Sequence, residues 1–209
     1  MITRSIEDKL REEYFKLLPN IRWTKEQLEA EVRFRLIQIL NTLQSHERFE
    51  VISRVKDCES AINSLRRRQE GSLFDTDHPE KYSLIQLKDL AGIRILVFPR
   101  GELINKIDTC IKDHFVSWEA DHVPGYREGD ENQAFKYFGH CSSNDIIYGE
   151  IQIVPMLTGL FWEVEHEAIY KPKPEFKSIA NSFEMQEKTQ KVLDALKDLE
   201  ETFERLSKT

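Results

Sequence analysis

The stretch KDLAGIRILVF, residues 88–98, constrains this chain most strongly. Apart from Arg94, residues 93–98 are large or β-branched apolar side chains, and turn-forming residues precede them, which favours a short buried strand over a helix. Asp89 lies at the start of this strand and Arg94 lies within it. A carboxylate and a guanidinium are not buried in an apolar core without a partner or a ligand. The pair therefore predicts part of a nucleotide or metal site at a central strand.

Composition limits the class of protein. The 209 residues suffice for one domain with a substantial core, and 40% hydrophobic with 32% charged content predicts a helix-rich globular chain. The net charge of -7 argues against a general nucleic-acid coat but leaves room for a local basic patch. The odd number of cysteines argues against a disulfide framework, so we expect a reducing cytoplasm. The first residues resemble a charged helix, and no apolar run approaches a membrane span.

Two helices are predicted at the start of the chain. Apolar residues recur at helical spacing over residues 4–18, and Pro19-Asn20 is predicted to end that helix. Thr24, with Gln27 three residues later, forms a capping-box pattern that predicts a second helix from there to about residue 44. We expect both helices to serve packing.

A basic segment follows. Residues 51–55 predict an extended lead-in, and Asp57 can cap a helix behind it. In the extended lead-in, side-chain alternation places Arg54 and Lys56 on one side. In the helix, the spacing places Ser60 and Ser64 on the side opposite the apolar face. The side chains concerned are Arg54, Lys56, Ser60, Ser64 and Arg66 to Arg68. This combination suits a polyphosphate, since lysine acts as a point charge and arginine as a fork or a stacking plate; a solvated basic helix explains it equally well.

The remaining pattern alternates helices and strands, which predicts a mixed sheet with helices packed on it. The expected elements are a helix at 102–115, a strand at 118–121, a loop at 123–135, a hairpin of 137–143 and 146–154 turning at Asn144-Asp145, and helices at 156–170 and 178–206. In the second hairpin strand, Glu150 and Gln152 share one face. Glu150 is the second carboxylate, after Asp89, at a strand position. Two such carboxylates, if they converge, can hold Mg²⁺ together with substrate phosphates.

Three segments in this order resemble the RelA/SpoT nucleotide pyrophosphokinases, the synthetases of stringent-response alarmones. They are Arg54-Val-Lys56-x-x-x-Ser60, Asp89-Leu-Ala-Gly-Ile-Arg94, and Glu150-Ile-Gln152-Ile with Trp162, Glu165-His166 and Tyr170-Lys171 behind it. The resemblance implies one synthetase domain of the α+β class, with a nucleotidyltransferase-like mixed sheet of about five strands. Its parts would be a helical N-terminus at 1–48, a catalytic core at 50–171 and a C-terminal helix at 178–206.

The resemblance also implies roles on the ATP side. The reaction would move the β,γ-pyrophosphate of ATP to a ribose 3′-hydroxyl. Arg54 and Arg94 would sandwich the adenine. Lys56 and Ser60 would contact the phosphates, helped by Arg66 or Arg68. Asp89 and Glu150 would bind Mg²⁺, and Glu150 is also the candidate base for the 3′-hydroxyl.

On the acceptor side, the resemblance is weaker. Tyr137 would take the place of the tyrosine that stacks on the acceptor base, and Tyr126 is a rival match. The supporting acceptor residues would be His140, Gln152, Glu165 and His166. This chain departs from the family pattern at four places. The family's G-Y-x-S-L-H is shortened here to Lys-Tyr-Phe-Gly-His, and Ser64 stands where the family has a lysine four residues after the motif serine. Val154-Pro155 stands where the family has Arg-Thr, and Gly159 stands where its guanosine-specific members have an asparagine.

These features predict an enzyme that makes (p)ppGpp from ATP and GDP or GTP. One alternative is a toxin of the same family that pyrophosphorylates the 3′ end of tRNA or an adenine nucleotide and stops growth. A second alternative is a nucleotide-binding module without catalysis. We expect no membrane partner; a homo-oligomer or an antitoxin partner stays open.

Overall fold

The computed structural model describes residues 5–123, 134–141, 144–165, 179 and 182–207. Its helices are α1 (Ile6–Leu40), α2 (Cys58–Arg67), α3 (Gly101–His114), α4 (Met156–Glu165) and α6 (Phe183–Ser207). Its strands are β1 (Arg48–Val55), β2 (Ala91–Phe98), β3 (Glu119–Ala120), β4 (Phe135–Cys141) and β5 (Asn144–Pro155).

The strands form one five-stranded sheet in the order β1-β2-β5-β4-β3. β2 and β5 pair in parallel, and the other neighbours pair antiparallel. The predicted α+β class with a mixed sheet of about five strands is therefore confirmed. The apolar run around residues 93–98 lies in β2, the second strand of the sheet, in which every residue except Arg94 and Phe98 is buried.

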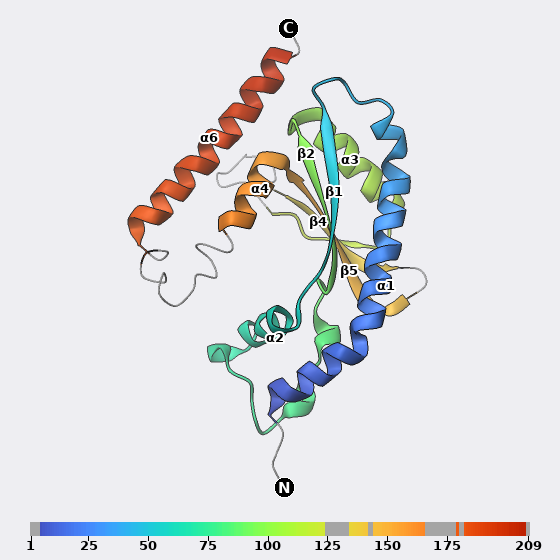
Figure 1. The fold of residues 1–209 in the computed structure, drawn as a ribbon, viewed down its shortest axis with the longest axis vertical. Coiled ribbons are helices and arrows are strands. Elements are labelled where there is room, and N and C mark those ends of the chain that lie inside the picture. Colours follow the sequence, from blue (N-terminus) through green and yellow to red (C-terminus); the bar gives the residue numbers. More distant parts are fainter. Residues whose placement is uncertain (1–4, 124–133, 142–143, 166–178, 180–181, 208–209) are drawn as a thin grey trace.

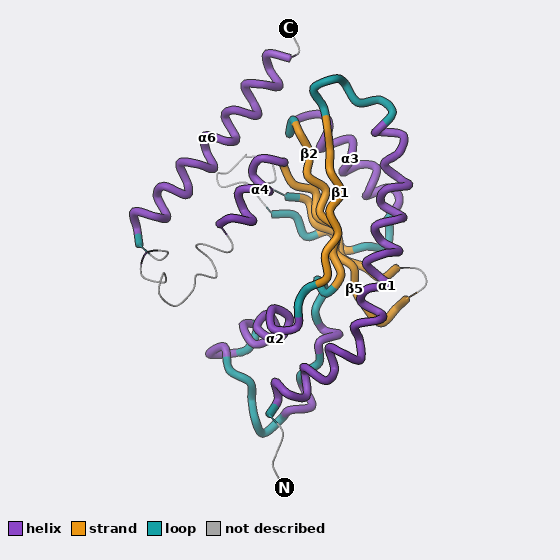
Figure 2. Tube along the Cα trace, viewed as in Figure 1, coloured by secondary structure: helices purple, strands orange, loops and turns teal. Residues whose placement is uncertain are grey.

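One face of the sheet, here called the core face, packs against α1 and α3. Its strand residues alternate with those of the opposite face, as the two-residue repeat of a strand requires. Figure 1 shows α1 and α3 on one side of the sheet and α4 with α6 on the other, and Figure 2 shows the sheet edge-on between them. The fully buried members of this core include Leu28 and Val32 of α1, Ile107 of α3, and Ile95 and Ile151 of the sheet.

The opposite face, here called the site face, is covered only at its ends. At one end, α4 packs on Leu96 and Val154, and Gly159 lets it approach closely, because a Cβ there would lie 2.6 Å from a Leu96 methyl. Beyond the other end of the sheet, where β2 begins, α2 packs with the start of α1 in a second core around Leu90 and Ala91. The middle of the site face is left for polar side chains.

The predicted break between two N-terminal helices is wrong. α1 runs without interruption from Ile6 to Leu40, with Pro19 inside it and Thr24 buried instead of capping a helix start. Proline removes a helix hydrogen bond at a cost of about 3 kcal/mol. A stripe of buried residues along the whole helix, from Leu10 to Leu36, supplies the tertiary packing that outweighs this cost.

Other predicted boundaries differ by a few residues. The expected turn residues Asn144-Asp145 lie inside β5, so the strands of the hairpin meet at residues outside the described ones. The predicted strand at 118–121 is the short β3, and the helix predicted at 156–170 begins at Met156 as expected. The last helix begins at Phe183 rather than near residue 178.

Candidate active site

Strand register places the predicted site residues in two neighbouring rows on the site face. In the first row, Arg54 of β1 lies beside Gly92 of β2, which lies beside Glu150 of β5. In the second row, Arg94 of β2 lies beside Gln152 of β5. Residues paired across neighbouring strands point to the same face, so these five positions share one surface.

Gly92 allows the first row to close. A Cβ at this position would lie 3.3 Å from Nε of Arg54 and 3.6 Å from Oε2 of Glu150. Because no side chain stands between them, the Arg54 guanidinium on β1 extends across β2 to the Glu150 carboxylate on β5. Nη2 of Arg54 lies 3.2 Å from Oε2 of Glu150. The glycine of the predicted motif therefore serves close approach of two charged side chains, as glycine within a strand often does.

The second row is hydrogen-bonded to the first. The Gln152 amide donates from Nε2 to Oε1 of Glu150 at 2.8 Å, and its oxygen accepts from Nε of Arg94 at 3.2 Å. Arg94 also donates to Oε1 of Glu163 on α4 at 2.9 Å. Burial, and then the positive charge of Arg54, lower the pKa of Arg94 below its ordinary value. Glu150 is only 4% exposed, so its charge depends on these partners.

A second ion pair lies at the start of β2. Lys56 follows β1 directly, and its ammonium pairs with Oδ2 of Asp89 and contacts Oγ of Ser64 at 3.2 Å. The other carboxylate oxygen of Asp89, Oδ1, is buried and has no hydrogen-bond partner in the described part of the protein. A buried carboxylate oxygen left without a partner is costly, and a bound cation is one way to satisfy it.

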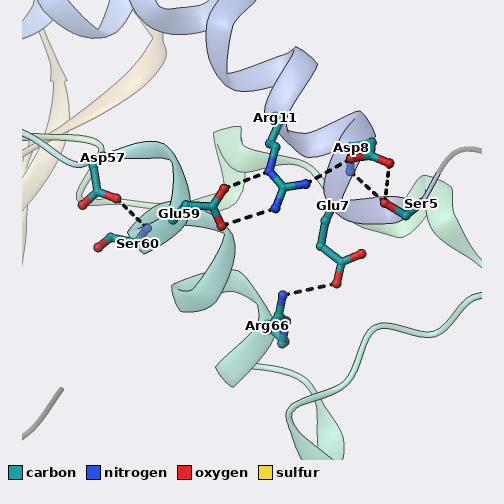
Figure 3. A network of polar contacts seen from close by, with 8 residues as sticks. All are labelled: Ser5, Glu7, Asp8, Arg11, Asp57, Glu59, Ser60 and Arg66. Atoms are coloured by element: carbon teal, nitrogen blue, oxygen red, sulfur yellow. Dashed lines mark hydrogen bonds and ion pairs between the residues drawn. The ribbon is translucent and has the colours of Figure 1, made fainter. Parts of the chain in front are cut away.

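The remaining predicted phosphate ligands are placed less directly. Ser60 lies in the first turn of α2, where its backbone N–H donates to the capping carboxylate of Asp57 at 2.9 Å. Arg66 pairs with Glu7 of α1 at 3.2 Å, in the network that joins the start of α1 to α2 in Figure 3. Arg68 donates to the backbone oxygen of Gln86 at 3.3 Å. Among the described residues, no contact joins Arg66 or Arg68 to the Lys56–Asp89 pair.

The two carboxylates fit a shared divalent cation in part. Asp89 and Glu150 have no direct contact, but each pairs with a cation, and those cations, Lys56 and Arg54, are two residues apart in the sequence, one directly after β1 and one near its end. In the described part of the chain, no three His, Cys, Asp or Glu side chains gather closely enough to hold a metal. The arrangement suits Mg²⁺, which usually takes one or two carboxylates and completes its shell with water and substrate phosphates.

The prediction for Tyr137 is wrong. Its register partner is Ile151, so its side chain lies on the core face, opposite Glu150. It is 2% exposed, and its hydroxyl donates to Asp108 of α3 at 2.6 Å. Burial and this hydrogen bond raise the pKa of Tyr137 well above its ordinary value. A ring packed in this way cannot stack on a ligand bound at the site face. The rival Tyr126 lies outside the described residues.

The neighbours of Tyr137 occupy the site face instead. Phe138 pairs with Glu150, and Lys136 pairs with Gln152, so an aromatic ring and an ammonium flank the carboxylate on its β4 side. His140 also lies on this face, with its ring centroid 3.9 Å from that of Tyr148. Nδ1 of His140 is buried without a hydrogen-bond partner in the part of the chain that is described.

Two further predicted acceptor residues lie outside the side chains described. Glu165 ends α4, and His166 follows the last described residue of that helix. The residues that the sequence pattern missed are Phe138, Lys136 and Glu163. The first two could have been found from the sequence, because side chains alternate between the two faces of a strand. Pairing residues 136–143 antiparallel with the strand of Glu150 would have shown which of them share its face. No local signal marks Glu163, because its partner Arg94 is 69 positions away.

Comparison with solved structures identifies the architecture. The small alarmone synthetase 1 from Bacillus subtilis matches with a TM-score of 0.67 and 17% identity, over 94% of this chain and 96% of that chain. The same enzyme in complex with AMPCPP matches with a TM-score of 0.65 and 18% identity, over 94% and 96%.

The chain has the fold of the small alarmone synthetases. A GTP pyrophosphokinase family protein from Streptococcus pneumoniae shares this synthetase fold, with a TM-score of 0.57 and 20% identity over 89% of this chain and 90% of that chain. No family model and no curated protein matches the sequence. No helix in the described ranges of this synthetase fold is long and apolar enough to cross a membrane.

Proposed function

We propose that this protein transfers pyrophosphate from ATP to the 3′-hydroxyl of GDP or GTP and so makes (p)ppGpp. The observation that carries the proposal is the pairing of Arg54 with Glu150 across β2 and of Lys56 with Asp89 just before β2, in a sheet with the synthetase fold. The Bacillus subtilis enzyme with this fold has been solved with AMPCPP and with its product pppGpp.

The donor would bind beside the two guanidiniums. Arg54 and Arg94 stand in neighbouring strands, and guanidinium faces stack on purines while their edges hydrogen-bond. Lys56 and Ser64 lie next to Asp89, where an ammonium and a hydroxyl suit phosphate oxygens. Asp89 and Glu150 would hold Mg²⁺, which supplies charge neutralisation on the phosphates when it is bound.

The acceptor would bind on the β4 side of Glu150. Its 3′-oxygen attacks the β-phosphorus, the bond from that phosphorus to the α,β-bridging oxygen breaks, and AMP leaves. Glu150 is positioned to take the hydroxyl proton, since general bases act within hydrogen-bond reach of the proton they remove. Orientation of the two reactants by the paired cations and carboxylates contributes the larger share of such a rate enhancement.

A second candidate acceptor follows from the corrected position of Tyr137. Because that ring lies in the core, the site face offers Phe138 and Lys136 beside Glu150. An ammonium beside an aromatic ring also suits a base and a backbone phosphate of single-stranded RNA. Transfer to the 3′ end of tRNA, the reaction of a growth-inhibiting toxin, is therefore the second candidate.

One assay separates these functions. The protein is incubated with labelled ATP and Mg²⁺, in parallel with GDP, GTP, ADP, ATP and bulk tRNA. We expect AMP and a labelled guanosine product; label in RNA supports the second candidate. A catalytically inactive nucleotide-binding module would release no AMP with any acceptor.

Variants then test the site itself. Asp89→Asn and Glu150→Gln should each lower the transfer rate by about 100-fold or more, since they remove a ligand charge and a base. Asp113→Asn, an exposed carboxylate change on α3, serves as the matched control and should retain activity. Full activity in both site variants, with wild-type melting temperatures, would place the chemistry elsewhere.

A further inference from the structure

Five side chains form a continuous polar chain across the site face. It begins at Glu163 on α4, passes through Arg94 on β2 and Gln152 and Glu150 on β5, and ends at Arg54 on β1. The donor-to-acceptor distances along it are 2.9, 3.2, 2.8 and 3.2 Å. The motif residues occupy four of the five positions, and Glu163 is the one that the motifs do not contain.

The contacts hold the Arg94 guanidinium by two of its edges. Nε donates to Gln152, and Nη1 donates to Glu163. Guanidinium N–H groups lie in the plane of the group, so two bonds to different partners fix that plane without occupying its flat faces. The side chain of Arg94 is only 17% exposed, whereas that of Arg54 is 47% exposed.

Arg94 needs a partner for electrostatic reasons as well. The neighbouring Arg54 carries the same charge, and its effect on Arg94 is unfavourable. Glu150 is already engaged with Arg54 and Gln152. Among the described side chains, Glu163 is the carboxylate that hydrogen-bonds Arg94, and it approaches from α4.

We propose that Glu163 is a positioning residue for the donor nucleotide, which orients Arg94 so that its face is preset to stack on the purine of ATP. This inference rests on the proposed function, because it takes the donor to be an adenine nucleotide beside Arg94. An oriented guanidinium loses less rotamer freedom when the nucleotide binds, so the entropic cost of binding is smaller. Glu163 itself acts through Arg94 and need not touch the nucleotide.

If Glu163 served only to stabilise the fold, its removal would lower the melting temperature and leave nucleotide affinity unchanged. We expect the melting temperature to change little, because Glu163 is 53% exposed and exposed ion pairs contribute little to stability. A positioning role predicts weaker nucleotide binding with the fold intact. Binding and stability are therefore measured on the same variants.

The experiment measures the affinity of AMPCPP, a non-hydrolysable ATP analogue, by calorimetry with Mg²⁺ present. We expect Glu163→Ala to bind about five- to tenfold more weakly than the wild type, and Glu163→Gln about two- to threefold, because the amide oxygen still accepts from Arg94. Glu31→Gln, which disrupts the exposed pair with Arg35 on α1, should bind as the wild type does. In steady-state assays, KM for ATP should rise while kcat changes by less than about threefold.

A double-mutant cycle gives the decisive comparison. In an Arg94→Ala background, Glu163→Ala should cause no further loss of analogue affinity, because the residue through which it acts is gone. Wild-type or tighter binding by Glu163→Ala, or an undiminished loss in the Arg94→Ala background, overturns the inference. If the wild type binds the analogue and transfers to no acceptor, the proposed function fails while the binding comparison still decides this inference.

Discussion

The site face has a proposed donor half, formed by β1, α2 and β2, and a proposed acceptor half, formed by β4 and the β4 side of β5. In the proposed donor half, Arg54, Lys56 and Arg94 pair with carboxylates at positions that short motifs specify. In the acceptor half, the predicted aromatic residue faces the core, and Phe138 and Lys136 take the site face. The difference teaches that spacing within one element is more informative than position across a hairpin.

Gly92 offers the most severe test of the donor half. Gly92→Val would insert a branched side chain where a Cβ alone would lie 3.3 Å from Nε of Arg54. We expect transfer to fall by about 100-fold, the loss typical of an ångström-scale misplacement, with little loss of stability because valine favours strands. Gly92→Ala should cost less. Transfer assays and thermal melts check this, and an active valine variant would show that Arg54 and Glu150 need not meet.

Glu200 on α6 tests how α4, the cover of one end of the site face, is held. It is 1% exposed, one of its oxygens accepts from the Leu157 backbone at 3.2 Å, and burial raises its pKa from 4.5 to about 7 against the opposing charge of Arg100. The folded state thus retains a proton that the unfolded state loses. The contribution of Glu200 to the free energy of unfolding is fully present below pH 4.5 and is lost as the pH rises through about 7.

The corresponding variant is Glu200→Gln. Raising a pKa from 4.5 to about 7 corresponds to about 3 kcal/mol of unfolding free energy at most. We expect the variant to lose the decline in stability between pH 5 and pH 8, measured by denaturant unfolding at each pH. Glu201→Gln, an exposed neighbour on α6, is the control and should keep the wild-type profile. Identical profiles for all three proteins would contradict the assigned proton.

Gly159 tests whether the acceptor half can be restored to the family pattern. Gly159→Asn introduces the asparagine that the resemblance assigns to guanosine-specific members of the RelA/SpoT family, but its Cβ would lie 2.6 Å from a Leu96 methyl. We expect destabilisation of about 2 kcal/mol by overpacking and no gain in guanosine preference. Chemical unfolding and acceptor competition assays measure the two effects. A stable variant with a changed acceptor preference would show that α4 sits differently when substrates bind.

The smallest expected effects come from a matched pair on β4. Tyr137→Phe removes the hydroxyl that donates to Asp108 and should cost about 1 kcal/mol of stability with unchanged transfer. Phe138→Ala should raise KM for the acceptor by roughly tenfold, as expected for loss of one stacked base, with KM for ATP unchanged. The reverse result, with Tyr137→Phe impairing acceptor binding, would restore the original prediction and break the distinction between the two halves.

The N-terminal helix α1 shows a second kind of feature that the sequence did not predict. Pro19 predicts a helix end from local physics, yet α1 passes through it, because packing of its buried stripe on the sheet and on α2 exceeds the local cost. The Glu163–Arg94 hydrogen bond is a third such feature, since no sequence pattern links two residues that are 69 positions apart. Both features depend on contacts between distant segments, which single-sequence reasoning cannot evaluate.

The sequence by itself determined the buried strand that follows Asp89 and contains Arg94, the mixed α+β sheet, and the common face of Glu150 and Gln152. These follow from periodicity inside one element, where two residues two apart in a strand must point the same way. Only the tertiary structure decided which β4 residues face the site and which helix supplies a partner for Arg94. A register shift of one residue turns every side chain of a strand to the other face, and register is set by pairing with the neighbouring strands and not by the strand's own sequence.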